Sequence, residues 1–150
     1  MRASILLSAL LFPSLSFQAQ FQSGDRVELT EPYPDDIYIA AGEIQVRAPI
    51  YGDCVIAGGN ISINDSISGD LMVGGGDITI RGTIGDDIRV AGGTIEIDSE
   101  VMDDLIVFGG KINVTENAVI HGNVVSYGGN LTMDGTVLGA MKASTVSGLG

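Results

Sequence analysis

The stretch Asp53–Gly69 reads DCVIAGGNISINDSISG, and the seventeen residues that follow it, Asp70–Asp86, read DLMVGGGDITIRGTIGD. The same pattern recurs at Asp36–Gly52 and at Asp87–Asp103. Its shared form is D-[IL]-x-V-x-G-G-x-I-x-I-x-x-x-[IV]-x-[GD]. Similarity at a fixed period of this length indicates a repeat architecture, in which each unit buries its apolar face against its neighbours.

The repeat runs from Asp36 to Gly139, which gives six units, and a seventh unit begins at Ala140. Every interval between unit starts is seventeen residues, except the interval from Asp104 to Asn123, which is nineteen. The unit starts are Asp36, Asp53, Asp70, Asp87, Asp104, Asn123 and Ala140. A period this regular predicts that residues 36–139 form one solenoid of about six coils.

Apolar residues recur at five places in each unit. The first place holds Ile37, Cys54, Leu71, Ile88, Leu105 and Val124, and the second holds Ile39, Ile56, Val73, Val90, Val107 and Ser126. The third holds Ile44, Ile61, Ile78, Ile95, Ile112 and Leu131, and the fourth holds Val46, Ile63, Ile80, Ile97, Val114 and Met133. The fifth holds Ile50, Ile67, Ile84, Val101, Ile120 and Val137.

The first and second places are two residues apart, and so are the third and fourth. Side chains two residues apart in a strand point to the same face of the sheet. We therefore predict three short strands per unit, turned inward around a roughly triangular coil with an aliphatic core. Stacked coils would pair as parallel strands about 4.8 Å apart. The predicted fold is all-β: a single-stranded parallel β-helix, or β-solenoid.

Glycines mark the corners of the predicted coil. Gly-Gly pairs recur between the first and second strands, at Gly58-Gly59, Gly75-Gly76, Gly92-Gly93, Gly109-Gly110 and Gly128-Gly129. We expect positive φ there, which glycine adopts without a Cβ clash. The first unit has Ala41-Gly42, so we expect the second glycine to be the required one. Gly52, Gly69, Gly122 and Gly139 stand at the last corner of four units, and Asp86 and Asp103 replace them in the two middle units. Aspartate suits such a corner because it tolerates left-handed backbone and accepts local amide hydrogen bonds.

Residues 1–19 are typical of a secretory signal peptide. Arg2 supplies a positive charge, and Ile5–Phe12 is an apolar run of eight residues. That run is too short to span a membrane, which takes about 20 apolar residues. We therefore expect an exported protein, located in the periplasm, at the cell surface or outside the cell.

The two segments that flank the repeats carry weaker patterns. Residues 20–35 contain one alternating stretch, Arg26–Leu29, followed by Pro32 and Pro34, which cannot donate to a sheet ladder. We predict a short strand there that lies over the first coil as an N-terminal cap. Residues 140–150 begin a seventh coil and stop, so we expect a partial coil or a truncated end.

Charge and cysteine content narrow the range of partners. The net charge of −12 disfavours nucleic acid, because an acidic surface repels phosphates. The chain holds one cysteine, Cys54, so it forms no intramolecular disulfide. Cys54 lies at a core place, and we expect a buried, inert thiol.

The repeats, together with ENAVIHGNVVSYGGNL at Glu116–Leu131, resemble the bactofilin-type polymer-forming cytoskeletal proteins. The resemblance covers Asp36–Gly139 and implies a right-handed β-helix that associates end to end without nucleotide. Cytosolic bactofilins carry no signal peptide, whereas this chain has the pattern of one. The resemblance is therefore better to the exported relatives of that family.

The acidic unit starts form a column of carboxylates at Asp36, Asp53, Asp70, Asp87 and Asp104, with Asp35, Asp86 and Asp103 beside it. We interpret them as aspartates that cap turns, and a row of Ca²⁺ ions is the alternative. His121 stands at a corner beside no obvious nucleophile, and the short corners leave no cleft. We assign no catalytic, cofactor-binding or metal-binding residue, and we expect a protein that is not an enzyme.

One outward row of the first strand is apolar. It reads Tyr38, Val55, Met72, Arg89, Ile106 and Val125, with Phe108 and Tyr127 nearby. Such a stripe is a candidate contact surface, although β-propensity alone also explains it. We predict a structural protein that polymerises with itself or joins a scaffold in the cell envelope through a partner there. The alternative is a binding or adhesion module that recognises a glycan or a protein.

Overall fold

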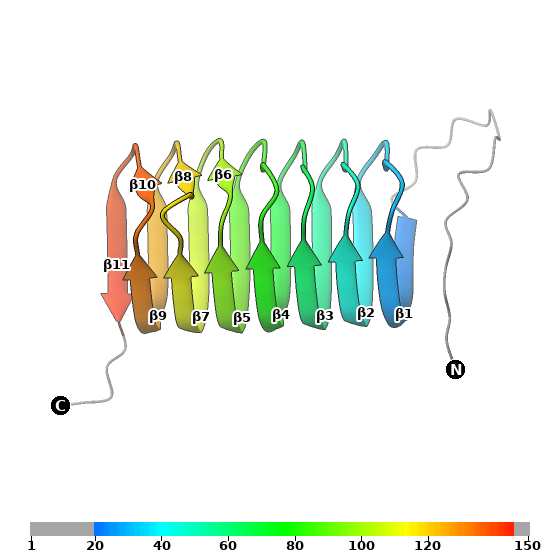
Figure 1. Cartoon of the computed structure of the whole chain (residues 1–150), viewed down its shortest axis with the longest axis horizontal. Helices are drawn as coiled ribbons and strands as arrows, with labels where there is room; N and C mark the ends of the chain where they lie inside the picture. The colour runs from blue at the N-terminus through cyan, green and yellow to red at the C-terminus, as the bar shows by residue number, and fades with distance from the viewer. Residues whose placement is uncertain (1–19, 146–150) are drawn as a thin grey trace.

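In a computed structural model, the described part of the chain is residues 20–145, and every regular element in it is a β-strand (Figure 1). The expected signal peptide, residues 1–19, and residues 146–150 lie outside the described residues. Eight strands form one sheet in the order β1-β2-β3-β4-β5-β7-β9-β11. They are β1 (Gln20–Leu29), β2 (Ile37–Val46), β3 (Cys54–Ile63), β4 (Leu71–Ile80), β5 (Ile88–Ile97), β7 (Leu105–Val114), β9 (Val124–Met133) and β11 (Met141–Thr145).

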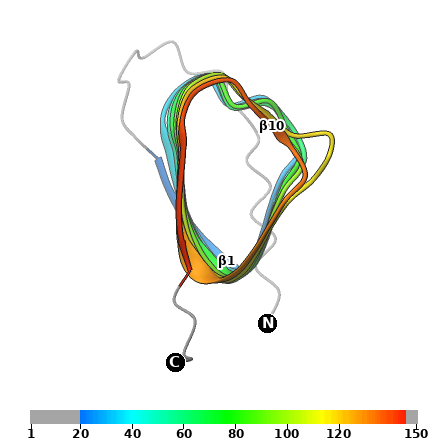
Figure 2. The same ribbon diagram turned by 90° about the vertical axis from the view of Figure 1, so that its left-hand side faces the viewer.

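All neighbouring strands are parallel, and their register follows the sequence repeat. Ile37 pairs with Cys54, Cys54 with Leu71, and Leu71 with Ile88. Each coil therefore lies on the preceding one with equivalent residues side by side. In the view along the rod, the coils overlie one another closely (Figure 2). The predicted β-solenoid with a period of about seventeen residues is confirmed.

The path of each coil differs from the expected triangle of three short strands. One ten-residue strand, such as Cys54–Ile63, carries both core pairs and continues through the glycine pair. The opposite side of the coil has only single bridges that join Tyr33, Ile50, Ile67, Ile84 and Val101, then the two-residue strands β6 (Glu100–Val101), β8 (Val119–Ile120) and β10 (Thr136–Val137). The outline is therefore an elongated loop with one long, bent side (Figure 2).

The solenoid has about seven turns rather than six, because residues 20–36 wind once around the core. β1 pairs with β2 from Gln20↔Ile37 to Leu29↔Val46, so it is a full-length strand rather than the short one expected. Val27 and Leu29 are buried in line with the core places, and Tyr33 pairs with Ile50.

The five places that the repeat predicts for the core are buried in nearly every coil. All residues at the first and second places from β2 to β9 are buried, including Cys54 and Ser126. At the other three places, the exceptions are Leu131, Met133 and Val137, which are only partly buried. All three belong to the last complete coil of the described residues, so the core is less well covered there than in the preceding coils.

The glycine corners are required by close stacking and not by positive φ, which corrects our expectation. No described glycine has positive φ. A Cβ at Gly92 would instead lie 2.8 Å from the carbonyl oxygen of Gly75 in the preceding coil. A Cβ at Gly58 would collide with the Ala41 carbonyl oxygen, whereas one at Gly59 would lie 3.0 Å from that of Gly42. The first glycine of this pair, not the second, is therefore the more crowded.

Candidate functional site

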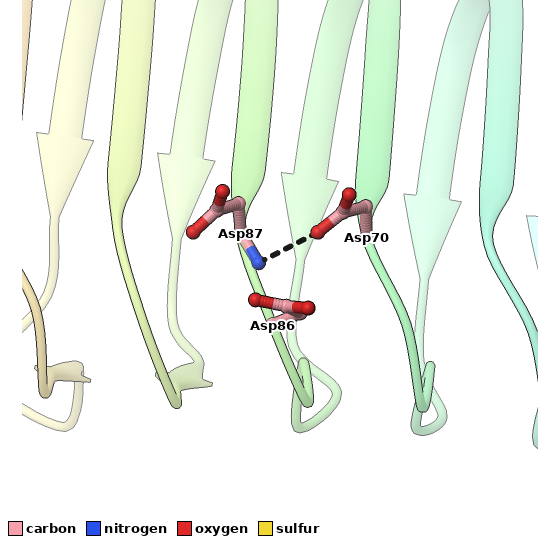
Figure 3. Close-up of side chains that lie close together, drawn as sticks. All are labelled: Asp70, Asp86 and Asp87. Carbon is pink, nitrogen blue, oxygen red and sulfur yellow. Dashed lines mark hydrogen bonds between the residues drawn. The ribbon is translucent and has the colours of Figure 1, made fainter.

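The aspartates that start the units form a hydrogen-bonded ladder along one edge of the solenoid. The Oδ1 atom of each accepts the backbone N–H of the equivalent residue one coil later: Asp36 from Asp53 at 2.7 Å, and Asp53 from Asp70 at 2.8 Å. Figure 3 shows the next bond, from the Asp87 N–H to Asp70, at 3.1 Å. The same bonds continue from Asp104 to Asp87, from Asn123 to Asp104 and from Ala140 to Asn123.

This geometry gives the aspartate column a structural role that agrees with the turn-capping interpretation. The residue at a unit start immediately precedes a long strand, and a side-chain oxygen rather than a backbone carbonyl accepts its N–H. Asn123 makes the same bond with its amide oxygen, at 3.0 Å from the Ala140 nitrogen. The ladder therefore needs an Oδ1 acceptor and does not need a negative charge.

The second carboxylate oxygen of two ladder aspartates contacts a cation from the apolar stripe, Arg89. The Arg89 guanidinium lies in the stripe, with Nη2 at 3.1 Å from Asp87 Oδ2 and Nη1 at 3.8 Å from Asp70 Oδ2. Because Oδ1 of both aspartates is bonded to the backbone, Oδ2 remains available for a cation. Among the described residues, Asp36, Asp53 and Asp104 form no ion pair.

Two groups of three carboxylates are crowded at the middle of this edge. Ligand oxygens of Asp70, Asp86 and Asp87 lie within 4.8 Å of one another (Figure 3). Those of Asp87, Asp103 and Asp104 do so as well. These are the residues of the described chain that could hold a cation of the kind that prefers oxygen ligands, such as Ca²⁺. Exposed acidic groups of this kind also occur without a bound ion, so we assign no metal to them.

The crowding changes how two of these acids bind protons. The negative charge of Asp70 is the main cause that raises the pKa of Asp86, and desolvation and Asp87 add to it. Desolvation is the main cause that raises the pKa of Asp103, followed by the charges of Asp104 and Asp87. Both acids stand where Gly52 and Gly69 stand in other coils.

The apolar stripe predicted on the first half of the long strands faces solvent. Tyr38, Met72, Phe108 and Tyr127 are exposed, with Met72 and Phe108 each at 48%. The Phe108 and Tyr127 rings stack, with centroids 5.3 Å apart and planes 12° apart. The remaining apolar members of the stripe, Val55, Ile106 and Val125, are partly buried.

The other residues weighed for chemistry have structural surroundings. His121 Nε2 lies 2.9 Å from Glu100 Oε1 at the corner of the coil, so the imidazole is paired with a surface carboxylate. Cys54 is buried as predicted, and desolvation raises the pKa of its thiol to about 12, so it stays protonated and inert at neutral pH.

Comparisons with known proteins return no relative. The chain matches no family model, and neither the curated proteins nor the solved structures contain a significant match to it. Within residues 20–145, no helix is present that could span a lipid bilayer.

Proposed function

We propose that this chain is an exported structural protein without enzymatic activity, which self-associates through the C-terminal edge of the coils that the structure describes. The sequence patterns described above support export, and the resemblance to polymer-forming proteins supports assembly. The observation that carries the proposal is the state of the last coil, where both the core and the backbone ladder are incomplete within the described residues.

The unpaired backbone groups of this end can be located from the coils before it. The N–H of Ile50 donates to Ser66 and the N–H of Ile67 donates to Thr83, each in the following coil and each at 2.9 Å. Val137 holds the equivalent place in the last coil. The described residues place no strand beyond it, because β11 covers only Val124–Gly128 of β9. An open strand edge of this kind is a template for another strand.

Charge also favours contact at this end. From Ala118 to Thr145, the chain has one acid, Asp134, and one base, Lys142. The first coil, in contrast, carries Asp25, Glu28, Glu31, Asp35 and Asp36 against Arg26. A nearly neutral, partly apolar end can approach another copy without the repulsion that two acidic ends would cause.

Replacing Val137 with proline tests this proposal. Proline removes the N–H that points away from the solenoid, while the Thr136 and Leu138 N–H groups keep their bonds to Ala118 and Ile120. We expect the wild-type chain to form concentration-dependent assemblies by sedimentation velocity and negative-stain electron microscopy. Val137→Pro should shift the chain to monomers, with circular dichroism unchanged.

Val137→Ala is the matched control, because it shortens the same side chain and retains the N–H. The proposal predicts that Val137→Ala still assembles. A wild-type chain that stays monomeric at every concentration contradicts the proposal, and so does a Val137→Pro chain that assembles as the wild type does. A monodisperse monomer would favour the second candidate, a binding module that uses the exposed stripe.

A further inference from the structure

The flank of the solenoid carries two parallel rows that run across the coils. One row is the outer oxygens of the aspartate ladder, and the other is the apolar stripe, which starts two residues later in each coil. Arg89 establishes that the rows are within reach of each other, since its guanidinium stands in the stripe and contacts Oδ2 of both Asp70 and Asp87. The rows therefore form one continuous surface.

Arg89 is the only cation in its row among the described coils from β2 to β9. The equivalent residues of the other coils are Tyr38, Val55, Met72, Ile106 and Val125. Each of those coils thus has an apolar side chain at the place where the coil of β5 has the Arg89 guanidinium. The carboxylates of Asp36, Asp53 and Asp104 consequently have no ion pair within the described residues, while their Oδ1 atoms stay bonded to the ladder.

Beside the stripe runs a second row of outward residues. Its side chains are small in the first four coils from β2 and aromatic in the next two. The small residues are Ala40, Ala57, Gly74 and Ala91. A Cβ placed on Gly74 would meet no atom within 4 Å, so the space above it is open. Phe108 pairs with Ala91, and its ring stacks on that of Tyr127 at the C-terminal end of this row. Aromatic faces of this kind attract ammonium and guanidinium groups.

We propose that this flank binds a basic, amphipathic segment of a partner protein. Lysine or arginine side chains of the segment would occupy the free Oδ2 positions, as Arg89 does internally. Apolar side chains of the segment would cover Met72, Phe108 and Tyr127. A helix laid along the rod suits this surface, because its pitch of about 5.4 Å is close to the coil spacing of about 4.8 Å. Tyr127 shares the last complete coil with Val137 but lies on β9 rather than β10. The surface therefore excludes the Val137 edge and does not depend on assembly.

A designed peptide is a direct probe of this surface. The peptide has about 20 residues, the length that spans about 30 Å as a helix, with lysines on one face and leucines on the adjacent face. Its binding to the full chain is measured by fluorescence anisotropy. We expect saturable binding that weakens with salt, because the charged contacts lie near solvent. A scrambled peptide of the same composition should bind about tenfold more weakly.

Three sets of substitutions on the flank separate the contributions of charged and apolar side chains to peptide binding. Asp53→Asn with Asp104→Asn keeps both ladder acceptors, as Asn123 shows, and removes two charges. Met72→Arg supplies an internal cation in the manner of Arg89. Met72→Ser with Phe108→Ser removes apolar surface without a change of charge. We expect each to weaken peptide binding by about tenfold, because charged and apolar contacts act together at such a surface.

Matched controls carry the same charge changes on the second half of the long strands, away from the stripe. Glu43→Gln with Asp77→Asn pairs with the double asparagine variant, and Thr79→Arg pairs with Met72→Arg. We expect these controls to bind within about twofold of the wild type. Equal losses in controls and flank variants would overturn the proposal in favour of a diffuse acidic field. Undiminished binding of the Met72→Ser, Phe108→Ser chain, or of the scrambled peptide, would overturn it as well.

The same measurement on the Val137→Pro chain keeps this proposal separate from self-association. Peptide binding by that variant should equal binding by the wild type, since the flank is unaltered. Loss of peptide binding in Val137→Pro would place the binding surface at the coil end and overturn the flank assignment. Spermine serves as a cation without apolar groups. Weak competition by spermine supports the proposal, whereas competition equal to that of the peptide contradicts it.

Discussion

Single side chains on the acidic edge have two separate tasks, one for each carboxylate oxygen. Oδ1 of Asp53 accepts the Asp70 N–H at 2.8 Å and holds one coil on the next. Oδ2 makes no bond to the ladder, and Arg89, the one cation of the stripe from β2 to β9, contacts this second oxygen on Asp70 and Asp87. Because amide and carboxylate share the first task, asparagine and alanine substitutions can tell the tasks apart.

Replacing Asp53 with alanine should lower the free energy of unfolding by about 1 kcal/mol, the net value of one hydrogen bond. Asp53→Asn should stay within about 0.5 kcal/mol of the wild type, because it retains an Oδ1 acceptor. Guanidinium unfolding midpoints, with the slope unchanged, measure both. If the two variants lost the same stability, the charge of Asp53 rather than its hydrogen bond would be responsible.

The crowded acids Asp86 and Asp103 make stability depend on pH. Their pKa values are raised in the folded chain, so the folded state binds these protons more tightly than the unfolded state does. The stability that this proton binding provides is fully present below the unfolded pKa of about 3.9 and is lost as pH rises through the folded pKa. At neutral pH both groups are charged and repel their neighbours.

We therefore expect Asp86→Asn to melt at a higher temperature than the wild type at pH 7, because it removes repulsion by Asp70 and Asp87. The difference should shrink as pH falls below about 4, where the aspartates of both states are protonated. Thermal unfolding followed by circular dichroism across this range measures it. Asp77→Asn, an exposed acid in the same coil, is the control for net charge. A wild-type chain as stable as Asp86→Asn at pH 7 would contradict this interpretation.

At the scale of the strand, the glycine pair allows each ten-residue strand to bend and still stack closely. In β4, the pair Gly75-Gly76 lies close to the backbone of the preceding coil, whereas the glycine before it, Gly74, does not. A Cβ at Gly75 would collide with the Gly58 carbonyl oxygen of the preceding coil, whereas one at Gly74 would meet open space. Neighbouring glycines in one strand therefore have opposite tolerance for a methyl group.

Gly75→Ala should reduce the free energy of unfolding by about 1–3 kcal/mol, because the backbone of two coils must move apart. Gly74→Ala should leave it unchanged or raise it by about 0.5–1 kcal/mol, since alanine loses less conformational freedom in a strand. Denaturant midpoints of the two variants are compared directly. Equal effects of the two substitutions would show that close stacking does not explain the glycine pair.

At the scale of the whole molecule, the sequence predicted the parts that repeat and missed those that do not. The five apolar places were predictable, because a residue such as Ile61 has an equivalent in each coil. The first coil was not recognised, because Gln22 occupies the place of Ile39 there and breaks the apolar pattern. Gln22 is nevertheless buried, and its Nε2 has no hydrogen-bond partner in the described structure.

The candidate sites were predictable to a similar degree. The aspartate column and the apolar stripe follow from the repeat, and turn capping follows from the chemistry of aspartate. The sequence did not predict that Arg89 bridges Asp70 and Asp87, because this contact depends on the spacing between coils and on side-chain direction. It also did not predict the continuous strand through the glycine pair, since glycine at a bend usually suggests a turn.

The solenoid is a rod whose two ends and flank have different surface properties. Its N-terminal coil is acidic, its C-terminal coil is nearly neutral with a partly exposed core, and its flank combines acids with apolar side chains. If copies join through coil ends, the parallel ladder continues across each junction and the strands of every copy lie across the filament axis.

Fibre diffraction from oriented assemblies of the wild-type chain tests this arrangement most directly. Continuous stacking of coils predicts a sharp meridional reflection at about 4.8 Å, the spacing of strands that cross the fibre axis. Assemblies whose strand reflection lies on the equator, or a chain that yields only monomers, would contradict the account.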